Sequence, residues 1–319
     1  MKTNNNYSYS WSELREKREK LPYRVSTFVA ISREMTPDRI KQIIKKHLPQ
    51  GNMLWGVTGD EYVAGFEGQP QFRLLKRSEL EEWVAKVNAS SPNKLILLEY
   101  AQDQTERVLS KIKAKNYVFV RGSWKYAFHR LPVYHKLVSK DRHFEFISPF
   151  VGEDEAKSYL AFGKMLLEPK TLDRLKTIED FMSGTWLVAK ASFDHSFQVG
   201  AILAENTGPG EYEYVSHAHN QVVPYETYAM HHGFLREENL SPPKDLNHYD
   251  AIHAETAALI SAKDSKGTTL FINVLPCPTC AKAVVFSGVS EVFYGLDHSD
   301  GYAVKLFKDA GIKTQKVEL

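Results

Sequence analysis

Four residues in the last third of the sequence have the types and the spacing of a metal-binding centre. Both cysteines of the chain, Cys277 and Cys280, lie in the pentapeptide PCPTC, and His253 and Glu255 lie in an HAE tripeptide 24 residues upstream of Cys277. Two thiolates three positions apart at the start of a helix can bind one metal ion from a single turn. An imidazole at the start of a second helix adds a third ligand and leaves the fourth tetrahedral position for water. The pattern therefore predicts a zinc site of the catalytic type, with His253, Cys277 and Cys280 as its ligands.

Two other roles for the cysteine pair explain less of the sequence. A CxxC motif can be a redox pair, and it can be one half of a structural zinc site. No further cysteine exists in the sequence to complete a site of four thiolates, and a redox pair would explain neither His253 nor Glu255. Glu255 comes two positions after the predicted histidine ligand, so we expect it to lie beside the water and not on the metal.

The combined pattern H-x-E…P-C-x-x-C is the signature of zinc-dependent nucleobase deaminases. Over residues 178–319 the sequence resembles the cytidine/deoxycytidylate deaminase superfamily: YDAIHAETAALISA is similar to its first zinc helix, and PCPTCAKAVVFSG to the second zinc helix of deoxycytidylate and tRNA-adenosine members. The resemblance implies a mixed five-stranded sheet between helices, with the last strand parallel to the fourth. Of the aromatic residues here, we expect Trp186, Phe193 and Phe197 in the core.

The resemblance also implies roles for residues around the zinc site. Asn220, at the end of the second strand, would contact the substrate sugar, and the backbone at Ala254 and Pro276 would line the slot for the base. Glu255 would take a proton from the water, pass it to the ring nitrogen, and then deliver a proton to the departing amino group. The sequence departs from the family at Ala257, where members often carry Asn.

A second departure is the long segment 221–249 between Asn220 and His253, which is rich in His, Tyr, Glu and Pro. Because it is too long for an ordinary connection, we expect a wall or lid of the substrate site. Four histidines in this segment and its approach offer a second metal site, but they have no fixed ligand spacing. Surface or pocket-lining positions are therefore favoured for His217, His219, His231 and His232.

The first half of the chain has a different pattern. Predicted strands alternate with predicted helices, namely strands at 24–32, 94–100 and 116–121 and a helix at 36–48. Glycines break 51–76 into short predicted strands and lack the spacing of a phosphate-binding loop. Alternating strands and helices predict a three-layer α/β domain. We therefore expect a separate basic α/β domain over 1–150, followed by the deaminase-like domain over 151–319.

Charge is unevenly distributed along the chain. Residues 1–170 hold 29 Lys and Arg against 20 Asp and Glu, a net charge of +9, whereas the remainder has −7. The stretch 111–142 has nine basic residues and one acid, with aromatic residues between them. Cations neutralise phosphates and aromatic rings stack on unpaired bases, so this mixture suits single-stranded or folded nucleic acid. The candidate contacts are Arg121, Trp124, Lys125 and Arg130. Two alternatives stay open: the two halves attract each other, or the stretch is a buried strand with a solvated basic rim.

Composition excludes several classes of protein. With 43% hydrophobic and 25% charged residues, the chain is neither disordered nor collagenous. Its two cysteines argue against a disulfide-stapled scaffold, and no stretch of about 20 apolar residues exists that could span a membrane. The start of the sequence lacks the apolar core of a signal peptide, so a cytoplasmic location is expected.

These observations lead to three functional hypotheses. The first is a zinc-dependent enzyme that hydrolytically deaminates cytosine or adenine within RNA or DNA, such as tRNA or single-stranded DNA, and releases ammonia. The second is a free-nucleotide deaminase of the deoxycytidylate type. The third is a non-catalytic, deaminase-like subunit that binds RNA; Glu255 argues against it, because inactive relatives commonly lose that residue. The sequence leaves open both the base and whether the chain forms a homo-oligomer.

Overall fold

A computed structural model describes residues 7–16, 20–30, 33–122, 130–159, 172–195, 197–242 and 249–318. By its internal contacts the chain divides into two compact units. The first, here called the N-terminal unit, comprises residues 1–158 together with 229–248. The second, called the C-terminal unit, comprises residues 159–228 and 249–319. The segment 229–248 therefore belongs with the first unit, although it lies in the second half of the sequence.

The N-terminal unit is built on a six-stranded sheet in which every neighbouring pair is parallel. The strand order is β1-β4-β3-β2-β5-β6, so the chain places successive strands first on one side of β2 and then on the other. The strands are β1 (Ser8–Ser10), β2 (Thr27–Ala30), β3 (Met53–Val57), β4 (Leu95–Glu99), β5 (Asn116–Val120) and β6 (His143–Ile147).

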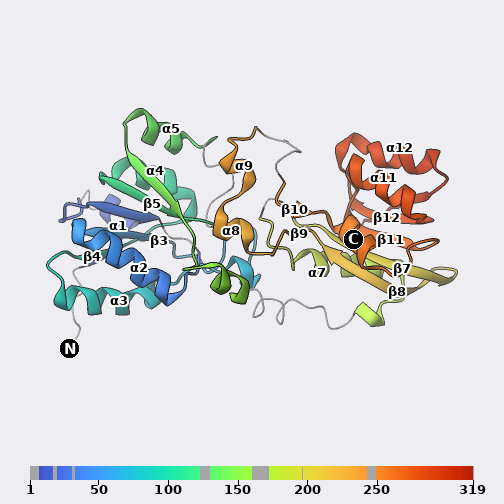
Figure 1. Ribbon diagram of the computed structural model, residues 1–319, viewed down its shortest axis with the longest axis horizontal. Helices are drawn as coiled ribbons and strands as arrows, with labels where there is room; N and C mark the ends of the chain where they lie inside the picture. Colours follow the sequence, from blue (N-terminus) through green and yellow to red (C-terminus); the bar gives the residue numbers. More distant parts are fainter. Residues whose placement is uncertain are drawn as a thin grey trace. The chain divides into compact units, whose positions relative to one another are not determined.

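Helices cover both faces of this sheet, because alternate residues of the buried strands point to opposite sides. Phe28 and Leu54 pack in one hydrophobic cluster, and Val29 and Trp55 in another. The first cluster includes α1 (Trp11–Glu16), α4 (Thr105–Lys111) and α5 (Pro132–Ser139), and the second includes α2 (Pro37–His47) and α3 (Arg77–Ser90). In Figure 1, α4 and α5 lie above the sheet and α2 and α3 below it. The prediction of a separate α/β domain is confirmed.

Two details of the N-terminal unit differ from the expectation. The stretch 51–76 contains a single strand, β3, followed by irregular backbone with an isolated bridge between Tyr62 and Arg73 and a 3-10 turn at Pro70–Phe72. Its glycines at 65 and 68 have positive φ, which ends extended structure there. A short strand at the chain start, β1, pairs with β4, and its three polar and aromatic residues (SYS) carry no strand pattern.

The C-terminal unit contains a mixed five-stranded sheet in the order β13-β12-β11-β7-β8. β7 is antiparallel to both of its neighbours, and β11, β12 and β13 are parallel, so the predicted sheet is confirmed. The strands are β7 (Gly200–Gly208), β8 (Glu211–His219), β11 (Thr269–Val274), β12 (Glu291–Leu296) and β13 (Lys313–Lys316).

Helices lie on both faces of this second sheet (Figure 1). One face packs against α10 (Ala254–Ser261), α11 (Pro278–Ser287) and α12 (Tyr302–Asp309), and the other against α7 (Ile178–Ala189). Gly200 permits the close approach of α7, since a Cβ atom there would lie 2.1 Å from the carbonyl oxygen of Thr185. The remaining elements are a two-stranded ribbon of β9 (Gln221–Val222) and β10 (Ala251–Ile252), and the short helices α8 (Tyr228–His232) and α9 (Leu235–Glu238).

Candidate zinc centre and substrate site

Two helix starts of the C-terminal unit bring four reactive side chains together. His253 is the N-cap residue of α10, with extended backbone, and Glu255 lies in the first turn of that helix. Cys277 is the N-cap residue of α11, Pro278 opens the helix, and Cys280 lies in its first turn. One ligating atom from each of these His, Glu and Cys side chains lies within 4.8 Å of all the others. The structure therefore assembles the whole set that the sequence pattern predicts.

The distances between the donor atoms fit a zinc ion. Nδ1 of His253 lies 3.5 Å from Sγ of Cys277 and 3.4 Å from Sγ of Cys280. In a tetrahedral site with Zn–N and Zn–S bonds of about 2.1 and 2.3 Å, a nitrogen and a sulfur ligand are about 3.6 Å apart. Thr256 contacts the same cluster, with its Oγ1 atom 3.4 Å from Sγ of Cys280. One imidazole and two thiols in this arrangement fit Zn²⁺.

The surroundings prepare these groups for metal binding. The hydrogen bond with Cys280, assisted by that with His253, lowers the pKa of Cys277 to about 3, so this thiol is a thiolate at neutral pH. Thiolate is the form that binds metal. Burial raises the pKa of Glu255, whose side chain is only 3% exposed. The carboxyl group is thus held in a largely dry position beside the ligand cluster.

Comparisons with known proteins agree with this geometry. The family profile described as "Cytidine and deoxycytidylate deaminase zinc-binding region" matches residues 175–296. Deoxycytidylate deaminase of Homo sapiens is 30% identical over 155 residues, which cover 45% of this chain and 81% of the human protein. This chain belongs to the cytidine and deoxycytidylate deaminase family.

Two further proteins whose descriptions name a deaminase are also similar to part of this chain. A protein of Aliivibrio fischeri described as "Uncharacterized deaminase in luxG 3'region" is 27% identical over 119 residues, or 37% of this chain and 71% of that protein. The crystal structure of dCMP deaminase from cyanophage S-TIM5, in complex with dCMP and dUMP, is 24% identical and covers 44% of this chain and 95% of that one, with a TM-score of 0.34.

The two backbone positions that the family assigns to the base slot adjoin the deaminase zinc cluster. Ala254 is fully buried and stands between His253 and Glu255 in sequence. Pro276 is buried directly before Cys277, where the chain leaves β11 for α11. Both positions therefore lie at the junctions that place the ligands, and their contact with the base stays a prediction.

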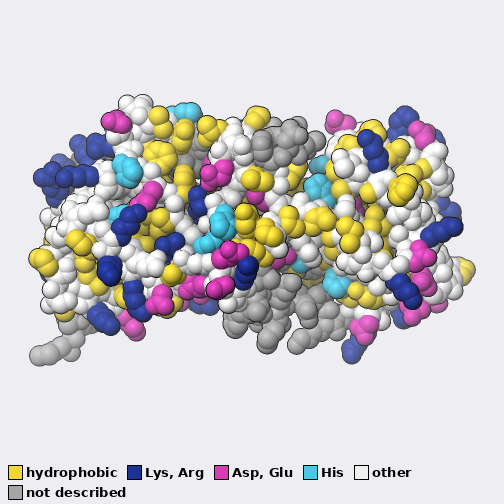
Figure 2. Space-filling model, viewed as in Figure 1, with side chains coloured by type: hydrophobic (Ala, Val, Ile, Leu, Met, Phe, Trp, Pro, Cys, Tyr) yellow, Lys and Arg dark blue, Asp and Glu magenta, His cyan; other side chains and the backbone are white. Residues whose placement is uncertain are grey.

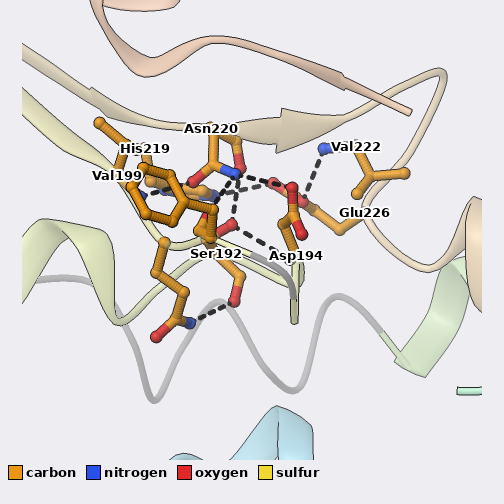
Figure 3. Close-up of polar contacts among 9 residues, drawn as sticks. Ser192, Asp194, Val199, His219, Asn220, Val222 and Glu226 are labelled. Carbon is orange, nitrogen blue, oxygen red and sulfur yellow. Dashed lines mark hydrogen bonds and ion pairs between the residues drawn. The ribbon is translucent and has the colours of Figure 1, made fainter. Parts of the chain in front are cut away.

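Asn220 holds a loop in place through its side chain (Figure 3). Its Oδ1 atom accepts a hydrogen bond from the backbone N–H of Val199 at 2.9 Å. Its Nδ2 atom donates to the carbonyl oxygen of Phe197 at 2.9 Å and to Oδ2 of Asp194 at 3.2 Å. Ser192 extends the network, since its hydroxyl donates to the Asn220 carbonyl and accepts from the Asp194 N–H. Asn220 is 5% exposed, so it organises the loop between α7 and β7.

Asp194 links this network to the zinc cluster. The pKa of His253 is raised, chiefly by its hydrogen bond with Cys277, and the negative charge of Asp194 contributes in the same direction. A Coulomb interaction weakens as the two charges move apart, so the Asp194 carboxylate lies near enough to act on the imidazole of His253. Asp194 has no recognisable signature in the sequence, because one Asp in a loop between a helix and a strand has no spacing pattern.

A second polar pair braces the start of the 221–249 segment. Nε2 of His219 lies 2.8 Å from Oε1 of Glu226, and Oε2 of Glu226 accepts a hydrogen bond from the backbone N–H of Val222 at 3.2 Å. Figure 3 shows this pair beside the Asn220 network. Both Glu226 oxygens are thus engaged, and the side chain is buried. The sequence places Glu226 seven residues from His219, a separation that no regular element predicts.

The expected core aromatics divide between core and surface. Phe193 is buried, as expected. Trp186 and Phe197 are 38% and 49% exposed, so the expectation is wrong for these two. The carbonyl oxygen of Phe197 is bonded to Asn220, and the Phe197 ring centroid lies 5.9 Å from that of His298. The residue type alone does not distinguish a buried aromatic ring from an exposed one.

Three of the four candidate histidines contact different partners, and the ring centroid of His232 lies 4.5 Å from that of His231. Nδ1 of His217 lies 2.6 Å from the Tyr214 hydroxyl, His219 is paired with Glu226, and His231 bonds Ser148 within the N-terminal unit. Within the described part of the chain, the only grouping of three or more potential ligands is the His253 cluster. The favoured interpretation, without a second metal site, is consistent with these contacts.

The candidate nucleic-acid contacts have different positions. Arg121 is 22% exposed and forms an ion pair with Glu238 at 3.0 Å. Arg130 is exposed, and Trp124 and Lys125 lie outside the described residues. On the face shown in Figure 2, Lys and Arg side chains are interspersed with Asp and Glu. No helix in the described ranges is both long and apolar enough to cross a membrane.

Proposed function

We propose that this chain is a zinc-dependent hydrolytic deaminase whose substrate is a free cytosine nucleotide of the deoxycytidylate type. The observation that carries the chemistry is the convergence of His253, Glu255, Cys277 and Cys280 within 4.8 Å. The substrate class is supported by the deoxycytidylate deaminase of Homo sapiens, which this chain matches over 81% of that protein's length. The ion pair of Arg121 with Glu238 also engages one of the guanidinium groups considered for nucleic-acid binding, which weakens the case for a polynucleotide substrate.

The chain's own residues divide the reaction between them. His253, Cys277 and Cys280 would hold the zinc ion, which when bound lowers the pKa of water and makes hydroxide available near neutral pH. Glu255 takes a proton from the attacking water and passes it to the ring nitrogen, which makes the neighbouring amino-bearing carbon electrophilic. Oxygen adds to that carbon as a hydroxyl group, Glu255 takes the proton of this hydroxyl and delivers it to the amino group, and the carbon–nitrogen bond breaks as the carbonyl forms. The products are uracil, in place of cytosine, and ammonia.

Substrate binding is assigned to the walls around this centre. The backbone at Ala254 and Pro276 is assigned to the base, and Asn220 is assigned to the sugar, as the resemblance to the family implies. Asp194 and the half-exposed Phe197 ring adjoin Asn220 and so face the same part of the substrate. In this arrangement the Asn220 network both shapes the wall and presents polar atoms to the sugar.

A second candidate is a cytosine or adenine base within RNA or DNA. It is favoured by the exposed basic residues of the stretch 111–142, which the free-nucleotide reaction does not need. These are Lys111, Lys113, Lys115, Arg130, Lys136, Lys140 and Arg142.

The test is ammonia release against a panel of nucleosides, nucleotides, single-stranded oligonucleotides and tRNA. The control is the Glu255→Ala variant purified in the same way, which reports any contaminating deaminase. Turnover of deoxycytidylate with none on polynucleotides supports the proposal. Turnover restricted to a polynucleotide establishes the second candidate, and ammonia release from no member of the panel contradicts both.

A further inference from the structure

The segment 229–242 leaves the deaminase half of the sequence and packs on the N-terminal sheet. In sequence it lies between Asn220 and the predicted zinc ligand His253. In contacts it belongs to the N-terminal unit. The chain therefore departs from the C-terminal unit after residue 228 and comes back to it at residue 249, just before the zinc ligand.

Specific side-chain contacts fix this segment. Nη2 of Arg121 forms an ion pair with Oε1 of Glu238 at 3.0 Å, and Nη1 donates to the carbonyl oxygen of His231 at 3.3 Å. The Ser148 hydroxyl lies 2.7 Å from Nδ1 of His231. Nη2 of the buried Arg33 contacts Sδ of Met230 at 3.3 Å. The start of the segment, at Met230 and His231, and its later residue Glu238 are thus bound to residues distant in sequence.

A glycine makes room for the same segment. Gly122 has φ +77°, which side-chain-bearing residues rarely adopt. A Cβ atom at this position would lie 3.0 Å from Cγ of Met230 and 3.7 Å from Cγ of Arg33. The ring centroid of Phe150 lies 6.3 Å from that of His231. The N-terminal unit therefore provides both the space for Met230, at Gly122, and the positive charge for Glu238, at Arg121.

All of these partners lie at the carboxyl ends of the parallel strands. Arg33 follows β2, Arg121 and Gly122 follow β5 directly, and Ser148 follows β6 directly. Because the strand order reverses between β2 and β5, this is the topological switch point of the sheet. Open α/β sheets bind their ligands in the crevice at that point. Here the chain's own segment occupies it.

The ends of the excursion are held together next to the zinc ligand. β9 and β10 pair in register, with Gln221 opposite Ile252 and Val222 opposite Ala251. The backbone N–H of Val223 also donates to the carbonyl oxygen of Asp250 at 3.0 Å. This ribbon follows Asn220 at one end and runs into His253 at the other, so the two ends of the excursion adjoin both residues in sequence.

We propose that residues 229–242 are an intramolecular latch: docked at the switch point of the N-terminal sheet, they let the N-terminal unit set the conformation of the substrate wall formed by residues 220–226 and 250–253. The partner that this edge of the sheet accepts is a segment of the same chain, recognised by Arg121 through a carboxylate and by Gly122 through a thioether side chain. The functional part of the inference rests on the proposed deaminase activity, and the docking part does not.

The test combines hydrogen exchange with steady-state kinetics on Arg121→Ala, on Glu238→Ala and on the charge-reversed pair R121E/E238R. Loss of a charge-assisted contact should speed amide exchange of 229–242 about tenfold in each single variant. The KM for the nucleotide should rise about fivefold, the lower end of measured coupling between sites. The reversed pair should restore both. Glu238 is half-exposed, so its removal tests the latch even where Arg121→Ala folds poorly.

Arg77→Ala is the matched control, since Arg77 is ion-paired with Glu81 and Glu99 in the same unit. It should change neither the exchange of 229–242 nor the KM. Unchanged exchange in the Arg121 and Glu238 variants overturns the docking, and faster exchange with unchanged KM overturns the coupling. Where the wild-type protein deaminates nothing, the proposed function fails and the latch is judged on exchange of 221–222 and 251–252: faster exchange supports it, and unchanged exchange overturns it.

Discussion

Asn220 and Asp194 are joined by a hydrogen bond from Nδ2 to Oδ2 at 3.2 Å, across 26 residues of sequence. The same amide binds the backbone of Val199 and Phe197, so one buried side chain closes the loop that borders the deaminase centre. A residue expected only to contact the substrate therefore also carries structure. Its replacement has two separable effects, one on the stability of the loop and one on the reaction.

Asn220→Ala should raise the KM, lower turnover and leave the zinc content unchanged. It should also lower the free energy of unfolding by about 1–3 kcal/mol, because the Val199 N–H and the Phe197 carbonyl lose their buried partner. Kinetics, metal analysis and denaturant unfolding measure these effects. Asn273→Ala is the control, since Asn273 is fully buried and bonds Gly200 and Gln198 in the same manner. Equal changes in KM for both variants would remove Asn220 from the substrate site.

The purified protein should contain about one zinc ion per chain, bound by His253, Cys277 and Cys280. Glu255→Ala should retain the metal, because the carboxylate is not a ligand, and should lose at least about 100-fold in turnover. Cys277→Ser should lose both. Elemental analysis of protein prepared with zinc supplied, alongside ammonia-release assays, checks all three. Undetectable zinc in the wild-type protein would contradict the metal assignment, and an active Glu255→Ala variant would contradict the role of Glu255.

The zinc site could be predicted from sequence because its information is local. Cys277 and Cys280 share one helical turn, and His253 and Glu255 share another, so spacing fixes the positions within each pair. The combined H-x-E…P-C-x-x-C signature connects the two pairs. The α/β architecture of the first half could be predicted in a similar way, from predicted strands that alternate with predicted helices. The contact of Arg121 with Glu238 spans 117 residues, and no periodicity or composition connects the two. The packing of residues 229–242 with the N-terminal unit therefore could not be predicted from the sequence, in which this segment lies within the deaminase-like half.

The latch should weaken as the pH falls. Burial lowers the pKa of His231, and the nearby positive charges of His232, Arg39 and Arg121 lower it further, while Glu153 opposes them. When the segment is undocked, His231 has the ordinary histidine pKa of about 6.5 and binds a proton more readily than it does in the docked segment. The contribution of His231 to the stability of the docked state is therefore fully present above about pH 6.5. It is lost as the pH falls toward the pKa of His231 in the docked segment.

Hydrogen exchange of 229–242 at pH 5.5 and 7.5, corrected for intrinsic rates, measures this dependence. His231→Gln keeps a polar partner for Ser148 without a titrating ring, and its protection should not change between the two pH values. His135→Gln, at an exposed position of α5, controls for the loss of a histidine elsewhere in the unit. Protection of the wild-type segment that is the same at both pH values would show that His231 does not control the docking.

The exposed basic surface of 111–142 gives the last prediction. If it binds nucleic acid, the affinity for single-stranded DNA or tRNA should fall steeply with salt, because each neutralised phosphate releases counterions. Removing three of its charges together, in Lys111→Ala/Lys113→Ala/Arg130→Ala, should weaken binding across all sequences and reduce the log–log salt slope by about one per lost phosphate contact. A variant lacking three exposed lysines of the C-terminal unit, Lys305, Lys308 and Lys313, matches the change in net charge and should bind as the wild type does. Gel-shift titrations at several salt concentrations decide between the accounts. Equal weakening in both triple variants would mean that net charge alone is responsible, and no binding at low salt would leave the free nucleotide as the substrate.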